Sequence, residues 1–311
     1  MARKTADTKQ KAFKTKAKKV KSAATGKKAQ VKTRSQAGSR NAATSKSGVA
    51  LQGTRRAALQ TAPPPGTIDQ IKQIAANSKI ARYYWLPNRG VAPPGYIKGM
   101  ALVYARIYCK FKAGNAAAIE MSKPDANNPA RDALSWYAPQ FAELGMSKAT
   151  AGIDTLRHLF VLMVGLGMQE SSGRYCDGRD ASEHNITADT AEAGLFQTSY
   201  NIHTVSPLLP SLFQSYSANP SGFLAVFKEG VTVKPGDLDN YGTGPGRDFQ
   251  KLEKDCPAFA AEFTAVALRH RRDHWGTING NAVELKADCE TMLLAVQNAV
   301  DASPGLCALL Q

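Results

Sequence analysis

A single glutamate, Glu170, stands where a strongly apolar segment gives way to a polar loop. Residues 155–169 are apolar on nearly all sides of a helix, and the polar residues 169–173 follow them. A carboxyl held partly against apolar neighbours has a raised pKa, because burial disfavours its charged form. A carboxyl that stays protonated at the edge of a cleft can act as a general acid. The position of Glu170 therefore predicts a proton donor, although a glutamate at a helix end is more often simply solvated.

Two later segments have the composition of a sugar-binding surface. Residues 193–198 combine small residues, which allow a ligand to approach the backbone, with Gln197, whose amide can bond a hydroxyl or acetamido group. Residues 240–247 form a glycine-rich turn with Tyr241 at its beginning. These side chains are the types that position a carbohydrate beside a proton donor.

Three motifs together resemble those of a known group of enzymes. Glu-Ser-Ser-Gly at 170–173, Gly-Leu-Phe-Gln at 194–197 and Tyr-Gly-Thr-Gly-Pro-Gly-Arg at 241–247 resemble the ordered motifs of soluble lytic transglycosylases and goose-type lysozymes. In those enzymes Glu-Ser ends a buried helix and is followed by Gly-Leu-Met-Gln and then Tyr-Asn-Ala-Gly-Pro-Gly. The resemblance covers about residues 155–250. It implies a lysozyme-like helical fold whose cleft cleaves a β-1,4-linked amino-sugar glycan, usually peptidoglycan.

The resemblance also implies roles for individual residues. Glu170 matches the catalytic acid that protonates the glycosidic oxygen, and Gln197 and Tyr241 match residues that line the sugar subsites. We include Ser171 among the predicted substrate contacts. No metal or organic cofactor is required. The sequence departs from the pattern at Phe196, where Met is usual, and at Gly242, which replaces Asn. The loss of that Asn also fits an alternative, a lysozyme-like module that binds glycan without cleaving it.

The loop between the first two motifs is rich in acids, and this bears on mechanism. Its acidic residues are Asp177, Asp180, Glu183, Asp189 and Glu192. An inverting hydrolase needs a second carboxylate about 6.5–9.5 Å from the acid, whereas a transglycosylase can use the 6-hydroxyl of its own substrate. Asp189 lies near the auxiliary Asp of goose-type enzymes and is the candidate base, with Asp180 and Glu192 as alternatives and as predicted substrate contacts. The loop can equally be a solvated surface or a cation-binding turn, and its charge keeps chitin or a neutral glucan open as substrate.

Helical periodicity dominates the chain after residue 66. It predicts helices over 68–85, 96–112, 130–144, 155–169, 207–216, 222–228, 248–254, 257–274 and 282–302. Alternating strand patterns are scarce, and we expect at most a short hairpin around residues 175–200. The predicted class is mainly α. His270 and His274 have a zinc-compatible spacing, but the arginines beside them argue against a metal.

The positive charge is concentrated at the N-terminus. The chain has 311 residues and a formal charge of +15. Residues 1–60 contain 17 of the 40 basic residues and one acid, so they carry +16 and the remainder carries −1. Residues 1–66 have too few apolar groups to fold alone, so we expect a disordered basic tail before a glycan-cleaving domain at 67–311. Such a tail can contact nucleic acid or an anionic cell envelope, or simply aid solubility.

The predicted substrate and the N-terminal sequence indicate different cellular compartments. Peptidoglycan implies a secreted, periplasmic or envelope protein, yet the N-terminus has no standard signal peptide. The longest apolar run, residues 159–168, is too short to span a bilayer. The five cysteines form no C-x-x-C pair. Their spacing allows one or two long-range disulfides or five buried thiols, and the oligomeric state is not indicated.

Overall fold

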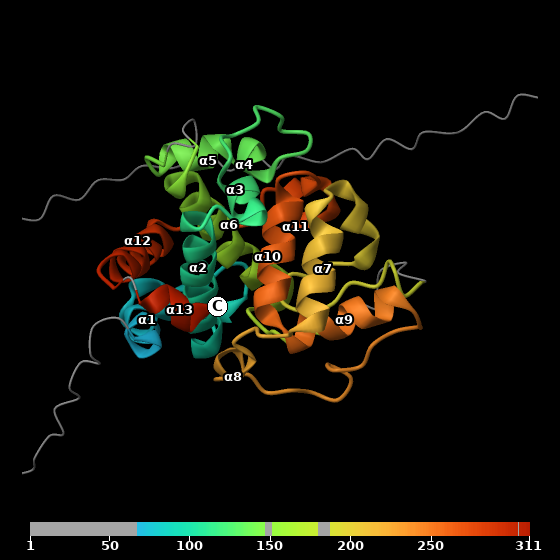
Figure 1. The fold of residues 1–311 in the computed structure, drawn as a ribbon. Coiled ribbons are helices and arrows are strands. Elements are labelled where there is room, and N and C mark those ends of the chain that lie inside the picture. Colours follow the sequence, from blue (N-terminus) through green and yellow to red (C-terminus); the bar gives the residue numbers. More distant parts are fainter. Residues whose placement is uncertain (1–66, 147–150, 180–186, 304) are drawn as a thin grey trace, which may run out of the picture. The chain divides into compact units, whose positions relative to one another are not determined.

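The computed structural model describes residues 67–146, 151–179, 187–303 and 305–311. The predicted tail at 1–66 and the candidate Asp180 lie outside these residues. The described chain is mainly helical, which confirms the predicted class (Figure 1). Its elements are α1 (Ile68–Asn77), η1 (Lys79–Arg82), β1 (Tyr84–Trp85), β2 (Gly90–Val91), α2 (Pro94–Lys112), α3 (Ala116–Ser122), α4 (Ala133–Trp136), α5 (Ala138–Glu143), α6 (Ile153–Ser171), η2 (Tyr200–Val205), α7 (Leu208–Ala218), α8 (Leu224–Phe227), α9 (Pro245–Asp255), α10 (Pro257–Leu268), η3 (Arg272–His274), α11 (Gly276–Asn279), α12 (Ala287–Asp301) and α13 (Leu306–Leu310).

The hairpin lies elsewhere than expected. Strands β1 and β2 pair antiparallel at residues 84–91, whereas the described part of 175–200 contains an isolated bridge between Ala193 and Thr198. Two-residue strands are too short to show alternation, so no periodic signal marks them. The turn between them depends on positive φ angles at Asn88 (57°) and Gly90 (74°), which only a short list of residues adopts readily.

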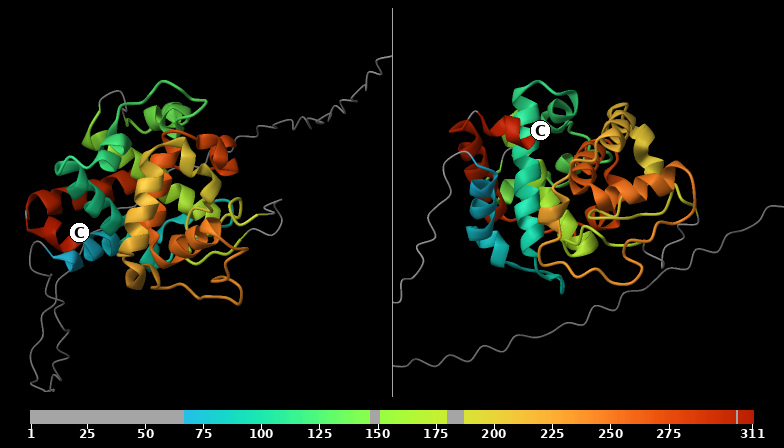
Figure 2. Two further views of the ribbon diagram at one scale, coloured as in Figure 1. Left: turned by 45° about the vertical axis from the view of Figure 1, so that its right-hand side comes forward. Right: turned by 60° about the horizontal axis from the view of Figure 1, so that its bottom comes forward.

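Helix α2 is the centre of the core. It packs against α1, α12, α8, α13, α3, α10 and α6, and most of its residues are buried. Close approach of α8 depends on a glycine, because a Cβ on Gly99 would lie 2.4 Å from the ring of Phe227. Figures 1 and 2 agree that α1 lies beside the C-terminal helices α12 and α13, and that α7 lies beside α10.

Helix α6 is the apolar helix expected at 155–169, and it is buried along almost its whole length. The hydroxyl of Tyr96 on α2 donates to the carbonyl of Val164 at 2.8 Å. The helix ends where Ser172 turns left-handed (φ 54°) and the N–H of Gly173 donates to the carbonyl of Gly167 at 3.0 Å. This is a Schellman-type end, and it places Glu170 in the last turn.

Three predicted helices are interrupted. The helix expected over 68–85 ends at Asn77, and η1 and β1 follow it. Segment 130–144 divides into α4 and α5 at Tyr137, and the long helix expected at 257–274 ends at Leu268. Arg269 follows, and its buried guanidinium donates to Asp132 (3.0 Å) and to carbonyls including that of Met121 (2.9 Å). The chain turns here because one side chain satisfies several otherwise unpaired loop carbonyls. Periodicity also missed the short helices α3, α11 and α13.

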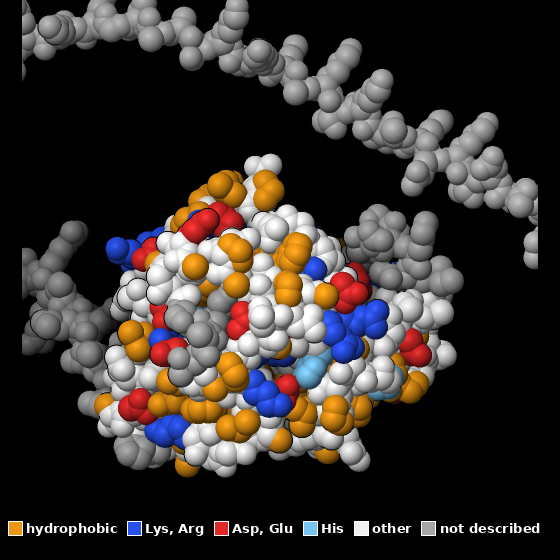
Figure 3. Space-filling model, turned by 90° about the horizontal axis from the view of Figure 1, so that it is seen from above, with side chains coloured by type: hydrophobic (Ala, Val, Ile, Leu, Met, Phe, Trp, Pro, Cys, Tyr) orange, Lys and Arg blue, Asp and Glu red, His pale blue; other side chains and the backbone are white. Residues whose placement is uncertain are grey.

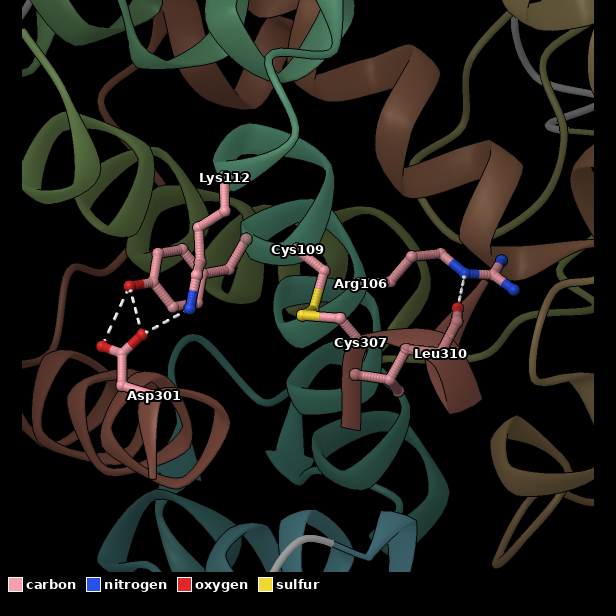
Figure 4. Close-up of a disulfide and its surroundings, with 7 residues drawn as sticks. Arg106, Cys109, Lys112, Asp301, Cys307 and Leu310 are labelled. Carbon is pink, nitrogen blue, oxygen red and sulfur yellow. Dashed lines mark hydrogen bonds and ion pairs between the residues drawn. A yellow bond between two sulfur atoms is a disulfide. The ribbon is translucent and has the colours of Figure 1, made fainter. Parts of the chain in front are cut away.

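A disulfide joins Cys109 on α2 to Cys307 on α13, with the two Cα atoms 5.4 Å apart. In Figure 4 the side chain of Arg106 extends away from the disulfide, and its guanidinium donates to the carbonyl of Leu310. Asp301, at the end of α12, accepts bonds from Tyr108 (2.7 Å) and Lys112 (2.9 Å) on α2. The other cysteines, Cys176, Cys256 and Cys289, are buried free thiols. Of the open alternatives, the structure contains one long-range disulfide.

The surface of the described chain carries both signs of charge. In the face drawn in Figure 3, basic and acidic side chains are interspersed among hydrophobic ones. This agrees with the nearly balanced charge after residue 60. Among the helices of the described ranges, none combines the length and the apolar composition needed to cross a bilayer.

Candidate functional site

A cleft of about 660 Å³ opens at the C-terminal end of α6. Its wall is built from the end of that helix, the turn between the strands, the loops after residues 176 and 234, and α11. The lining residues are Arg89, Gln169, Glu170, Asp177, Gly178, Arg179, Glu192, Gln197, Pro235, Gly236, Asp237, Asp239, Asn240, Tyr241 and Thr277. Glu170, Gln197 and Tyr241, one from each of the three motifs, therefore lie in one cleft together with Glu192.

Glu170 is half-buried at the rim of the core. Burial raises its pKa, while a hydrogen bond from Thr277 and the positive charge of Arg89 partly oppose that rise. The hydroxyl of Thr277 donates to Oε1 of Glu170. Oε1 is therefore occupied as an acceptor, which leaves Oε2 to carry the proton when the group is protonated. Burial favours that protonated form.

Gln197 is held rigidly in the second motif. Its backbone has a positive φ of 47°, and its side chain is 7% exposed. Nε2 donates to the carbonyls of Gly194 (3.1 Å) and Gly178 (3.3 Å), which fixes the orientation of the amide. The indole of Trp275 donates to the carbonyl of Phe196 at 2.9 Å and supports the same turn. Oε1 of Gln197 has no hydrogen-bond partner among the described residues, so it is an acceptor in need of a donor.

Tyr241 lies at the mouth of the cleft and is 41% exposed. Its backbone N–H donates to Oε1 of Gln250 at 2.8 Å, and Nε2 of Gln250 donates to the carbonyl of Ala188 at 2.9 Å. The guanidinium carbon of Arg179 lies 4.1 Å from the centre of the Tyr241 ring. Packing explains the glycine at position 242, because a Cβ there would lie 2.8 Å from the Cβ of Ala188.

The cleft is lined by more acids than bases. Burial raises the pKa of Asp177 to about 6, against the opposing charge of Arg174. Asp237 forms an ion pair with Arg174. Glu192 lies 3.9 Å from Nε2 of His274. Burial, and then the charge of Arg271, lower the pKa of His274 to about 4, so this imidazole is neutral at neutral pH.

Two predicted site residues lie outside the cleft wall. Ser171 is buried, and its Oγ lies 2.8 Å from the carbonyl of Leu195, to which it donates, so it joins α6 to the second motif. Asp189 is exposed and is not among the described lining residues. Its carbonyl accepts from Asn201 at 2.8 Å, and its Oδ1 lies against Gly246. Both residues are close in sequence to residues of the site, but their side chains make contacts elsewhere.

Most of the lining residues were not foreseen as site residues, and Asp177, Arg89 and Thr277 are the three of them that contact or charge the predicted ones. Asp177 belongs to the acidic loop, but nothing in its local sequence distinguishes it from the other acids. Arg89 comes from the turn between β1 and β2, and Thr277 from a four-residue helix 107 positions after Glu170. Only the tertiary fold brings them together.

A metal centre needs several ligand side chains close together. Within the described ranges, no group of three or more His, Cys, Asp or Glu side chains could hold an ion. His270 and His274, the pair with zinc-compatible spacing, have different neighbours: Nε2 of His270 lies 3.0 Å from Glu120, whereas His274 lies beside Glu192.

Comparison with known proteins gives no relative. The chain matches no protein-family model, no curated protein and no solved structure.

A buried carboxyl lies beneath the second motif and leads to a first prediction. Glu253 is fully buried under Gly194, and neither of its oxygens has a hydrogen-bond partner in the described chain. Burial raises its pKa well above the ordinary value of 4.5. Ionisation is therefore easier in the unfolded chain, and stability falls as pH rises above that value. We expect Glu253→Met to raise the free energy of unfolding at pH 8 by about 1–3 kcal/mol. The melting temperature should then rise by a few degrees.

The stabilisation by Glu253→Met should depend on pH. At pH 4 the carboxyl is largely protonated in both states, so the gain from Glu253→Met should be smaller there. Calorimetry of both proteins at the two pH values measures this difference. An equal gain at both pH values would show that packing, rather than ionisation, is responsible.

Proposed function

We propose that this protein is a glycosidase of the lysozyme or lytic-transglycosylase type, with Glu170 as the general acid. The observation that carries the proposal is the convergence of Glu170, Gln197 and Tyr241 in one cleft. These residues belong to three motifs that are separated in sequence. Glu170 supplies a half-buried carboxyl with a raised pKa, Gln197 an unpaired amide oxygen, and Tyr241 an exposed ring on which a sugar can stack.

The proposed substrate is a β-1,4-linked amino-sugar glycan, and the first candidate of this class is peptidoglycan. An open cleft of about 660 Å³ has room for several linked sugars. Its acids disfavour a strongly anionic polymer, and Arg89 and Arg179 offset part of this charge. The disulfide agrees with a substrate outside the cytoplasm, because disulfides persist in oxidising compartments. Chitin and neutral glucans are the alternative substrates.

Product analysis tests the proposal directly. The full chain is incubated separately with purified peptidoglycan, chitin oligosaccharides and neutral β-glucan, and the products are analysed by mass spectrometry. New reducing ends would identify a hydrolase, and anhydro-sugar ends a transglycosylase. Binding without product after prolonged incubation would contradict catalysis and favour a glycan-binding module. The tight contact between Gly242 and Ala188 weakens that alternative, because packing alone accounts for the glycine.

A second prediction concerns Thr277, the hydrogen-bond donor to Glu170. Thr277→Val keeps the shape of the side chain but removes the donor, so the pKa of Glu170 should rise further. The protonated acid then persists to higher pH, and the alkaline limb of the activity profile should move to higher pH. Loss of orientation should lower kcat about tenfold.

The matched variant is Thr277→Ser, which keeps the hydroxyl. It should restore the position of the alkaline limb, as measured from kcat against pH for the three proteins. A purely structural role would lower the activity of both variants without moving the limb.

A further inference from the structure

We propose that Asp177 is the second catalytic carboxylate of this cleft and takes a proton from the attacking water, which makes the enzyme a hydrolase. The inference rests on the proposed function and deepens it, because it assigns the partner of Glu170. It replaces Asp189, the base expected from the sequence, whose side chain does not line the cleft among the described residues.

The backbone holds Asp177 against the sugar-binding turn. The carbonyl of Asp177 accepts from the N–H of Gly194 at 2.9 Å, and the next carbonyl, of Gly178, accepts from the amide of Gln197 at 3.3 Å. Asp177 and Gln197 therefore belong to one rigid part of the wall. Arg89 connects this part to the acid, since its charge stabilises the ionised forms of both Asp177 and Glu170.

An unpaired acceptor in the same wall indicates what the site binds. Gln197 is 7% exposed, and its Oε1 lacks a hydrogen-bond partner within the described ranges. A buried carbonyl oxygen without a donor costs about 1–3 kcal/mol, so it is typical of a place that a hydroxyl, an amide N–H or a water fills. Because this oxygen is buried, a small movement of the side chain is needed before it can accept a bond from a water or a sugar hydroxyl in the cleft.

The charges that face Asp177 suit a base at neutral pH. Arg174, with its Nε 3.7 Å from Oδ1, favours the carboxylate, as do Lys234 and Arg89. Burial, and to a smaller extent Asp237, favours the protonated form, and the net result is a pKa of about 6. Above pH 6 the group is therefore mainly ionised and can accept a proton. Activity should accordingly rise through about pH 6 on the acidic side.

The reaction is a single displacement. Glu170 gives its proton to the glycosidic oxygen as the bond from that oxygen to the anomeric carbon breaks, and the oxygen keeps the electron pair. The oxygen of water forms a new bond to the anomeric carbon, and Asp177 takes one proton of that water. The products are a sugar with a new anomeric hydroxyl of inverted configuration and a sugar with a free hydroxyl. Proton exchange with solvent then restores both carboxyls.

The test compares variants of the full chain in water enriched in oxygen-18. On the glycan that the wild type cleaves, we expect the label in the new reducing end and the inverted anomer in early NMR spectra. Asp177→Asn should lower kcat about 10²–10³-fold and change KM only a few-fold. Asp69→Asn is the matched control, because Asp69 is a surface residue of α1 paired with Lys72. It should retain wild-type activity.

Chemical rescue separates the two carboxyls. Azide should restore turnover to Asp177→Ala, because it replaces the activated water, whereas Glu170→Ala should instead recover on aryl glycosides with good leaving groups. The reverse pattern would exchange the roles and overturn the proposal.

Two further outcomes would also overturn the assignment of Asp177. One is wild-type activity of Asp177→Asn alongside an inactive Glu170→Gln, and the other is an anhydro-sugar product. A fully active Glu170→Gln would instead contradict the proposed function itself, so the two failures are distinguishable.

Discussion

Glu170→Gln should lower kcat about 10³-fold while glycan affinity stays close to that of the wild type. The amide has almost the same shape as the carboxyl and can still accept the hydrogen bond from Thr277. It cannot donate an acidic proton to the leaving oxygen, so the loss should appear in kcat rather than in KM. Steady-state kinetics on the cleaved glycan, together with calorimetric titration of an oligosaccharide, measures both quantities.

Glu143→Gln is the matched control for this change. Glu143 lies at the end of α5 and is not among the described residues that line the cleft. The same chemical change there should leave kcat unaltered. If Glu170→Gln kept more than a tenth of wild-type turnover, Glu170 would not be the general acid.

Removal of the disulfide should have the largest effect on stability. The bond between Cys109 and Cys307 closes a loop of 198 residues, and a closure of that length is worth about 5 kcal/mol through the entropy of the unfolded chain. Cys307→Ser should therefore lower the melting temperature by about 10–15 °C. Scanning calorimetry under oxidising conditions measures the shift.

Reduction supplies the control for this prediction. A reducing agent should lower the melting temperature of the wild type toward that of Cys307→Ser and leave the variant unchanged. The double change at residues 109 and 307 should cost no more than the single one. A reducing agent that left the wild-type transition in place would contradict a stabilising bond.

The fold class could be predicted from the sequence because the long helices have strong signals. The apolar segment that became α6 is long and almost without polar residues, and α2 and α12 have clear periodicity. Short elements could not be found this way. The strands β1 and β2 have two residues each, and α11 has four, so no repeat of the pattern is available to mark them.

The candidate site was predictable mainly where a residue lay inside a recognisable motif. Glu170, Gln197 and Tyr241 belong to the three motifs, Glu192 was one of several acids considered in the loop between them, and all four line the cleft. Ser171 shows the limit of this reasoning, because adjacent residues near a helix end point in different directions. Its neighbour Glu170 faces the cleft, while Ser171 faces the core.

Asp177 and Thr277 show why the rest of the site could not be predicted. Asp177 differs from the other acids of its loop only because of the cations that surround it in the folded protein. A threonine becomes a partner of the acid only when a distant short helix packs against α6. Neither fact has a counterpart in local sequence.

The segment from Trp275 to Thr277 connects two parts of the cleft wall. Trp275 bonds the second motif and Thr277 bonds the acid, so one short stretch sets the spacing between Gln197 and Glu170. Neither contact involves residues 235–241, which form another part of the cleft wall. Substitutions there should therefore change the shape of the cleft without changing the relative positions of the Glu170 carboxyl and the Gln197 amide.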